Sequence, residues 1–385
     1  MDAMSQPLLS VSDLSVAFHQ QGRATTAVDH VSFDIKRGEC VALVGESGSG
    51  KSVSALSVLK LLPYPVASHP SGSIRFKGRD LLPLSEGEMR EIRGSDISII
   101  FQEPMTSLNP LHTIERQISE ILQLHQPISN SAARKRVLEL LTQVGIPEPE
   151  TRLGSYPHQL SGGQQGRVAI ARAIAADPPI LLMDEPFAAI DPVVRERLQD
   201  ELLLLQQRLQ KTIVLVTHDI NEAIRLGDKI AIFQEGGVLA QFDTPDRILA
   251  HPASEFVRRF IGPEPNLKRL GMIQVGQLPR HDVPLLDEAL TPIASAHPPL
   301  ASPLRLVLDR QRRPLHWFDP LRGLTLPVER PLASSHSLRF AYSALLDVAT
   351  GVLVHVDGEG QYQGAVSHAL LQQVLDGAVG VRPHD

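Results

Sequence analysis

The chain has 385 residues, of which 42% are hydrophobic and 21% charged, so it can fill real cores and is not a disordered protein. Its net charge of −6 argues against a protein whose main partner is nucleic acid. Cys40 is the only cysteine in the sequence, so no internal disulfide can form, which fits a reducing cytoplasm.

The N-terminal segment lacks the features of a targeting or membrane sequence. Asp2 precedes any apolar run, and no basic segment accompanies it, unlike in a signal peptide. No stretch approaches the roughly 18 uninterrupted apolar residues that suggest a transmembrane helix. We therefore expect the protein to contact a membrane only through a partner.

The first 262 residues alternate short apolar runs with stretches of helical periodicity. Between about residues 103 and 160 the helical pattern replaces the strands, which predicts a helical insertion inside one α/β domain over residues 1–262. Four short apolar runs are typical of buried parallel strands: Val41–Val44, Ile97–Phe101, Ile180–Met183 and Ile213–Thr217.

A different pattern follows this domain. Prolines are frequent over residues 263–300, which we interpret mainly as a linker. A weak repeat then predicts strand, turn, strand twice, in Val307–Trp317 and in His355–Ala365, and the second unit continues into the helical run Ser367–Leu375. Two βαβ-like units would form a small α+β domain over residues 301–378.

A phosphate-binding loop is predicted where the first apolar run ends. Gly45-Glu46-Ser47-Gly48-Ser49-Gly50-Lys51-Ser52 matches the pattern G-x-x-x-x-G-K-[ST], with a strand before it and a helical run after it. Its glycines let backbone N–H groups point at phosphates, and the helix N-terminus adds positive potential. We expect Lys51 to neutralise the β and γ phosphates of ATP and Ser52 to be a ligand of Mg²⁺. The flanking strand and helix disfavour an accidental match in a Gly/Ser-rich turn.

Two carboxylates end the third apolar run. We expect Asp184 to hold Mg²⁺ and Glu185 to orient and polarise the attacking water. A strand that ends in a solvated acidic turn is common, but the phosphate loop upstream disfavours that alternative.

Leu160-Ser161-Gly162-Gly163-Gln164 resembles the signature sequence of ABC ATPases, and the other motifs of that family occur in the family's order. The resemblance covers residues 8 to about 262 and implies a P-loop NTPase of ABC type that binds ATP and Mg²⁺. It also implies four single-residue roles: Phe18 stacks on adenine, Gln102 reaches the Mg²⁺ and the water, Asp191 belongs to the D-loop, and His218 contacts the γ-phosphate.

The resemblance further implies that the protein works as a head-to-tail homodimer. Ser161, Gly162, Gly163 and Gln164 would bind the ATP held by the opposite subunit, helped by the N-terminus of the following helix. Hydrolysis would open the dimer and pull on integral membrane permease subunits served by an extracytoplasmic substrate-binding protein, at the cytoplasmic face of the bacterial inner membrane. Gly166 stands where the family usually has glutamine, from which we expect slower or weaker coupling.

Two classes of importer share the resemblance. Residues 40–160 resemble ATPases of peptide importers, especially in Ser98–Pro110. Residues 168–270 resemble ATPases of glycine betaine, choline and carnitine importers, and the C-terminal repeat resembles a degenerate pair of the CBS regulatory units that this second family often carries. We therefore expect a quaternary-amine importer, with a di- or oligopeptide importer as the alternative.

Three other interpretations of the sequence stay open. The chain could be a non-transport ABC protein, although it has one phosphate loop, one signature sequence and no long heptad run. It could be a folded but inactive mosaic, given Gly166 and the change of resemblance near Gln164. The C-terminal domain could be a packing or dimerisation module that binds nothing.

Overall fold

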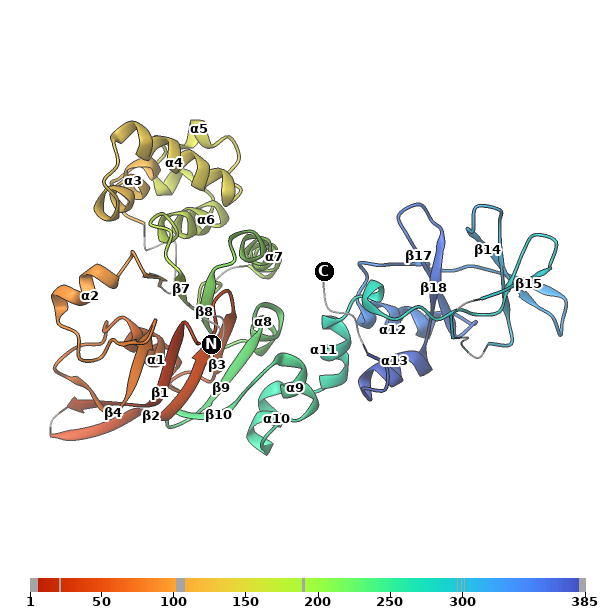
Figure 1. The fold of residues 1–385 in the computed structure, drawn as a ribbon, viewed down its shortest axis with the longest axis horizontal. Coiled ribbons are helices and arrows are strands. Elements are labelled where there is room, and N and C mark those ends of the chain that lie inside the picture. The colour runs from red at the N-terminus through yellow and green to blue at the C-terminus, as the bar shows by residue number, and fades with distance from the viewer. Residues whose placement is uncertain are drawn as a thin grey trace. The chain divides into compact units, whose positions relative to one another are not determined.

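The computed structural model describes residues 6–20, 22–101, 108–188, 191–295, 297–298, 300 and 302–380, with the side chains at positions 193, 207 and 209 excluded. The chain divides into two compact units, Met1–Ile261 and Gly262–Asp385 (Figure 1). Among the described residues, none of the helices combines the length and the hydrophobicity that crossing a bilayer requires.

A six-stranded sheet forms the centre of the N-terminal unit. Its order is β10-β9-β3-β8-β7-β6, and all neighbours are parallel except β9 and β10. The four apolar runs of the sequence all lie in this sheet, as β3, β6, β7 and β8. The bounds of its strands are β3 (Cys40–Gly45), β6 (Ile97–Ile100), β7 (Ile180–Asp184), β8 (Thr212–Thr217), β9 (Lys229–Gln234) and β10 (Val238–Asp243).

Both faces of this sheet are covered, because side chains alternate along each strand. In β7, Ile180 and Leu182 belong to one apolar core, whereas Leu181 and Met183 belong to another. The first core also includes helix α1 and an antiparallel sheet of order β2-β1-β4-β5. These elements and the short helix α2 have the bounds β1 (Leu9–Gln20), β2 (Arg23–Ile35), α1 (Lys51–Val58), β4 (Ala67–Phe76), β5 (Arg79–Asp80) and α2 (Glu86–Ile92).

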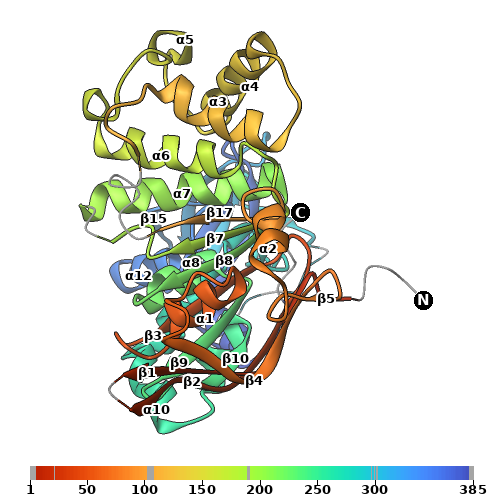
Figure 2. The ribbon, with the colours of Figure 1, turned by 90° about the vertical axis from the view of Figure 1, so that its left-hand side faces the viewer.

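The second core supports the helical insertion that the sequence predicts. Leu122 of α3 and Val168 of α6 are fully buried in it. Thr113 and Ser129 cap the N-termini of α3 and α4 by accepting backbone hydrogen bonds. Figure 2 shows α3, α4 and α5 at one end of this unit, with β1, β2 and β4 at the other. The helices are α3 (Ile114–His125), α4 (Asn130–Gln143), α5 (Pro149–Arg152), η1 (Pro157–Gln159) and α6 (Gly162–Ala173).

Four more helices complete the N-terminal unit. Helices α7 and α8 contact each other, and α8 also packs on β3 and β8. Leu198 and Leu202 of α7 are buried in the second core. The four are α7 (Pro192–Leu209), α8 (Ile220–Leu226), α9 (Pro245–Ala250) and α10 (Glu255–Ile261).

The C-terminal unit contains two sheets, of order β12-β11-β13-β14-β15 and β16-β17-β18. The two hairpins predicted from the repeat are β13–β14 and β17–β18. Strands β16 and β17 are parallel and joined by α12, whereas the described residues between β11 and β13 contain β12 and no helix. The bounds are α11 (Pro265–Met272), η2 (Val275–Gln277), β11 (Leu285–Leu286), β12 (Pro292–Ile293), β13 (Arg305–Leu308), β14 (Pro314–Asp319), β15 (Leu324–Pro327), β16 (Leu332–Ala333), α12 (Leu338–Asp347), β17 (Val352–Val356), β18 (Tyr362–Ser367) and α13 (His368–Leu375).

The stretch 263–300 is not mainly a linker, and that prediction is wrong. It contains α11, η2, β11 and β12, and its residues Leu270 and Leu285 are buried in the two cores of the C-terminal unit. The prolines misled the prediction because proline is also favoured in the first turn of a helix, where Pro265 stands.

Candidate active site

The phosphate-binding pattern forms the loop between β3 and α1. Lys51 is the first residue of α1, and its side chain is buried. Its Nζ donates hydrogen bonds to the carbonyl oxygens of Gly45 (2.9 Å) and Glu46 (2.6 Å) and to Ser49 Oγ (3.3 Å). The ammonium is thus held within the curl of the loop, beside the N–H groups of the helix N-terminus.

Two glycines of this loop are required by its close approach to neighbouring backbone. A Cβ atom on Gly45 would lie 2.3 Å from the carbonyl oxygen of Phe233, and one on Gly50 would lie 2.4 Å from that of Ala27. Gly50 also has a φ of +91°, in the left-handed region that favours glycine. Side chains at these positions would force the loop away from the strands that support it.

Ser52 connects α1 to the end of β7. Its Oγ donates a hydrogen bond to Asp184 Oδ1 at 2.8 Å, and Asp184 is buried. Burial raises the pKa of Asp184, although the hydrogen bond from Ser52 opposes this shift. Burial lowers the pKa of Lys51, and the charges of Glu185 and Asp184 oppose that shift. A buried cation at the start of α1 and two oxygen ligands, from Ser52 and Asp184, thus lie in one region, an arrangement suited to a polyanion with a bound hard cation.

Glu185 and His218 lie beside this group. His218 Nδ1 is 3.4 Å from Glu185 Oε2. Glu185 has a φ of +46°, which is uncommon for a residue other than glycine, and its N–H donates to the carbonyl oxygen of Val216 at 2.9 Å. The chain therefore turns sharply at the residue that the sequence predicts to act on water.

The parallel sheet brings these groups to one edge. Val44 of β3 pairs with the last residue of β8, and Asp184 of β7 pairs with Val216 of β8. The carboxyl ends of the three strands therefore lie side by side, and the phosphate-binding loop, Glu185 and His218 directly follow them. Ligands of open α/β sheets bind at this edge.

The signature segment forms the start of α6. Ser161 Oγ accepts a hydrogen bond from the N–H of Gln164 at 3.3 Å, and the N–H of Ser161 donates to Gln164 Oε1 at 3.0 Å. This capping box leaves the exposed Ser161 and the first N–H groups, of Gly162 and Gly163, at a helix N-terminus. Among the described residues, no hydrogen bond joins Ser161 to the phosphate-binding loop of the same chain.

Two further predicted residues, Asp191 and Phe18, are described by the contacts they make elsewhere in the N-terminal unit. Asp191 is exposed, and its carbonyl oxygen accepts a hydrogen bond from the N–H of Arg195 at the start of α7. Phe18 is half-buried against the first apolar core. Gln102 lies outside the described residues. A Cβ atom on Gly166 would meet nothing within 4 Å.

The sequence prediction missed one buried acid close to this site. Glu222 of α8 accepts a hydrogen bond from Thr217 Oγ1 at 2.6 Å, directly before His218 in the chain. Burial raises the pKa of Glu222, and the bond from Thr217 opposes this shift. An acidic residue in the first turn of a helix that follows a fully buried strand is the signal that could have indicated it.

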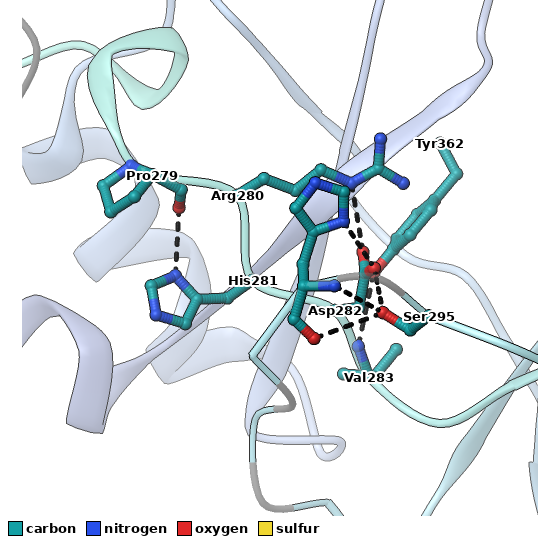
Figure 3. A network of polar contacts seen from close by, with 8 residues as sticks. Pro279, Arg280, His281, Asp282, Val283, Ser295 and Tyr362 are labelled. Carbon is teal, nitrogen blue, oxygen red and sulfur yellow. Dashed lines mark hydrogen bonds and ion pairs between the residues drawn. The ribbon is translucent and has the colours of Figure 1, made fainter.

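The C-terminal unit has a polar cavity of its own, of about 290 Å³. Arg280, His281, His297 and His355 are among the residues that line it. Figure 3 shows the buried Asp282 beside it, which accepts hydrogen bonds from Arg280 Nε at 3.2 Å, from His297 Nδ1 at 3.1 Å and from Ser295 Oγ. These bonds fix one wall of the cavity.

Comparison with known proteins shows similarity to ATP-binding proteins of transporters. The family model described as ABC transporter matches residues 28–188. The peptidoglycan transport ATP-binding protein YejF of Agrobacterium fabrum is 54% identical over 261 residues, which cover 68% of this chain and 48% of that protein. The chain therefore spans about half the length of this relative.

Two further similarities span more of the matched protein. The oligopeptide transport ATP-binding protein OppD of Bacillus subtilis is 39% identical over 296 residues, which cover 77% of this chain and 78% of that protein. A dimeric structure of a post-hydrolysis state of the ATP-binding cassette MJ0796, bound to ADP and Pi, has a TM-score of 0.53 and 32% identity and covers 61% of this chain and 98% of that one.

Proposed function

Because the chain belongs to the family of ABC transporter ATP-binding proteins, we propose that it binds and hydrolyses ATP to drive an importer of di- or oligopeptides. The observation that carries this proposal is the meeting of Lys51, Asp184, Glu185 and His218 at the carboxyl edge of one parallel sheet. A cation, an oxygen pair and a water-orienting carboxylate are the parts that phosphoryl transfer from ATP to water needs.

Each part has a role that follows from its position. The N–H groups from Ser47 to Ser52 and the Lys51 ammonium bind the β and γ phosphates, because the loop and the helix N-terminus present donors to an anion. Glu185 orients the attacking water and polarises it. His218, whose ring lies close to Glu185, donates to the γ-phosphate.

The oxygen pair Ser52 and Asp184 fits Mg²⁺. Their oxygens lie 2.8 Å apart and are hard donors, and Mg²⁺ is usually held by one or two protein oxygens together with phosphates and waters. Among the described residues, no group of three or more His, Cys, Asp or Glu could hold a metal ion. Bound there, Mg²⁺ would neutralise charge on the phosphates.

We assign the importer to the peptide class and no longer to the quaternary-amine class, which the sequence analysis favoured. The two relatives described above are named for transport of peptidoglycan and of oligopeptides, and neither name refers to a quaternary amine. The helical insertion with α3 and α4, whose sequence resembles peptide importers, is the surface that binds the permease in the family. These same names favour a transport role over a role in DNA repair or translation.

The proposed working form is a head-to-tail homodimer bound to permease subunits and supplied by a substrate-binding protein. Ser161 and the N–H groups of Gly162 and Gly163 bind the γ-phosphate held by the other copy. The exposure of Ser161 at a helix N-terminus supports this role, as does the similarity to a cassette whose structure is dimeric. In this dimer Gln102, Asp191 and Phe18 keep their predicted roles.

The C-terminal unit is a regulatory module of CBS type that responds to ionic strength or to an adenine nucleotide. The order β16-α12-β17-β18-α13 and the cavity lined by Arg280, His281 and His355 support this role. Deleting residues 263–385 and measuring ATPase activity against salt tests it. Identical salt responses with and without these residues would contradict a regulatory role.

Two measurements test the function itself. Lys51→Ala should lose binding of a fluorescent ATP analogue, because burial of the phosphates without the ammonium leaves their charge uncompensated. Vesicles containing the permease subunits, the substrate-binding protein and this chain should accumulate a labelled tripeptide but not labelled glycine betaine. Accumulation of glycine betaine alone would return the assignment to the quaternary-amine class.

A further inference from the structure

Glu222 is a buried carboxylate with a hydrogen-bond donor at each oxygen. It lies on α8 and is 7% exposed. Its Oε2 accepts a hydrogen bond from Thr217 Oγ1 at 2.6 Å, and its Oε1 accepts one from Gln199 Nε2 at 3.1 Å. A buried carboxylate is tolerated only when such donors compensate its lost hydration, so both neighbours fix its position.

The bond to Thr217 bears on the backbone that carries His218. Thr217 is the last residue of β8, and its Oγ1 also accepts a hydrogen bond from the N–H of Asp219 at 3.1 Å. One hydroxyl therefore joins Glu222 to the residues on both sides of His218. The ring of His218 lies 3.4 Å from Glu185, so a displacement of this turn would change that separation.

The bond to Gln199 leads to a second part of the site. Gln199 lies on α7, the helix that begins at Pro192, directly after Asp191. Arg225 of α8 strengthens the connection, because its Nη1 donates to Gln199 Oε1 at 3.3 Å and its Nη2 donates to Asp200. Helices α7 and α8 are therefore joined by a polar network in which Glu222 is the residue that also reaches β8.

We propose that Glu222 is a positioning residue that couples the helix following Asp191 to the turn carrying His218. A shift of α7 is passed through Gln199 to the Glu222 carboxylate and on to Thr217, because these two links are direct hydrogen bonds between buried groups. Thr217 then carries the shift to His218 through the peptide bond that joins them. The inference rests on the proposed ATP hydrolysis, in which His218 contacts the γ-phosphate. Glu222 is buried and reaches His218 through Thr217, so it acts on the rate of hydrolysis and not on ATP binding.

Steady-state ATPase kinetics of Glu222→Gln and Glu222→Ala test this role. We expect kcat to fall about tenfold in the alanine variant and less in the glutamine variant, whose amide oxygen can still accept one of the two bonds. KM for ATP and the affinity for an ATP analogue should stay unchanged. Glu196→Gln, at an exposed position on α7, is the matched control and should keep the parent kcat.

A double-mutant cycle separates coupling from a merely structural effect. Gln199→Ala removes the bond from α7 and should lower kcat, and combining it with Glu222→Gln should lower kcat no further, because both changes break one pathway. Additive losses in log kcat would overturn the proposal. So would variants with a lower unfolding midpoint but the parent kcat per folded molecule.

Failure of the proposed function and failure of the coupling through Glu222 give different results. If the parent chain hydrolyses no ATP, the proposed function is wrong and the coupling is wrong with it. If the parent is active and Glu222→Gln matches it in kcat, the coupling alone is wrong. Should Glu222→Ala not fold, the kcat values of Glu222→Gln and Gln199→Ala decide the question in its place.

Discussion

Ser52 Oγ donates a hydrogen bond to Asp184 Oδ1 at 2.8 Å, although 132 positions separate the two residues in the chain. The bond joins the N-terminus of α1 to the carboxyl end of β7, the two elements that carry the phosphate-binding loop and the carboxylate pair. It places a hydroxyl and a carboxylate where one divalent cation can contact both.

Replacing Asp184 should separate stability from activity. Asp184→Asn should reduce Mg²⁺-dependent ATP hydrolysis at least tenfold, because a neutral amide is a poorer Mg²⁺ ligand. At pH 7 the same variant should unfold at a higher temperature than the parent in the absence of nucleotide. Burial raises the pKa of Asp184 in the folded chain, so folding disfavours its charged form.

The sign of this stability effect can be checked by pH. The folded pKa of Asp184 lies above the unfolded value of about 3.9. Its favourable contribution to the free energy of unfolding is therefore full below the unfolded pKa and is lost as pH rises through the folded pKa. The advantage of Asp184→Asn should therefore shrink as the pH is lowered towards about 4. A variant less stable than the parent at pH 7 would contradict this assignment.

Gly166 should be replaceable at a gain in stability. It lies inside α6, and a Cβ atom there would meet nothing within 4 Å, so Gly166→Ala should raise the free energy of unfolding by about 0.5–1 kcal/mol. Chemical denaturation of the N-terminal unit measures this. Gly50→Ala is the contrasting variant and should be destabilising, since its Cβ would lie 2.4 Å from the Ala27 carbonyl oxygen. A loss of stability in Gly166→Ala would show that the open space beside α6 is needed.

Asp282 should be a main determinant of stability in the C-terminal unit. Burial alone would raise its pKa, but the hydrogen bonds from Ser295, Arg280 and His297 lower it below the ordinary value. Asp282→Ala leaves these donors without their acceptor and should cost about 3 kcal/mol. Trp317, the one tryptophan of the sequence, lies in the adjoining core, so its fluorescence reports this unfolding directly.

The control and the pH dependence make this prediction specific. Asp347→Asn changes an exposed ion pair with Arg330 and should leave the Trp317 transition unchanged. The folded pKa of Asp282 is depressed. Its contribution to the free energy of unfolding is therefore present above the unfolded pKa of about 3.9 and is lost as pH falls through the folded pKa. If Asp282→Ala and the parent have the same Trp317 unfolding midpoint at pH 7, the network in Figure 3 does not stabilise the C-terminal unit.

Local patterns predicted much of the N-terminal unit. The loop from Gly45 to Ser52 is recognisable because its close approach to neighbouring backbone requires glycine at positions 45 and 50, and a lysine directly follows Gly50. The strands around it are recognisable because both faces of a parallel sheet are apolar, so their residues form continuous apolar runs, as in β7 and β8.

Three other features, namely the role of Glu222, the structure of residues 263–300 and the bond between Ser52 and Asp184, depend on contacts that no local sequence pattern encodes. In the sequence, Glu222 cannot be distinguished from any other acidic residue in the first turn of a helix. Its role follows from the hydrogen bonds that Thr217 and Gln199 donate to its two oxygens in the folded chain. The prolines of residues 263–300 suggest a linker or the start of a helix equally well, and burial of Leu270 decides between them. The bond between Ser52 and Asp184 likewise follows from sheet topology and not from either motif alone.

ATP hydrolysis at this sheet edge is tested by comparing the parent chain with Glu185→Gln, with Glu196→Gln as the exposed control. Glu185→Gln keeps the size of the side chain but cannot accept a proton from water, so hydrolysis should fall at least about 100-fold while ATP binding is retained. The control should match the parent. Hydrolysis by Glu185→Gln at the parent rate would contradict the assignment of this edge as the site of ATP hydrolysis.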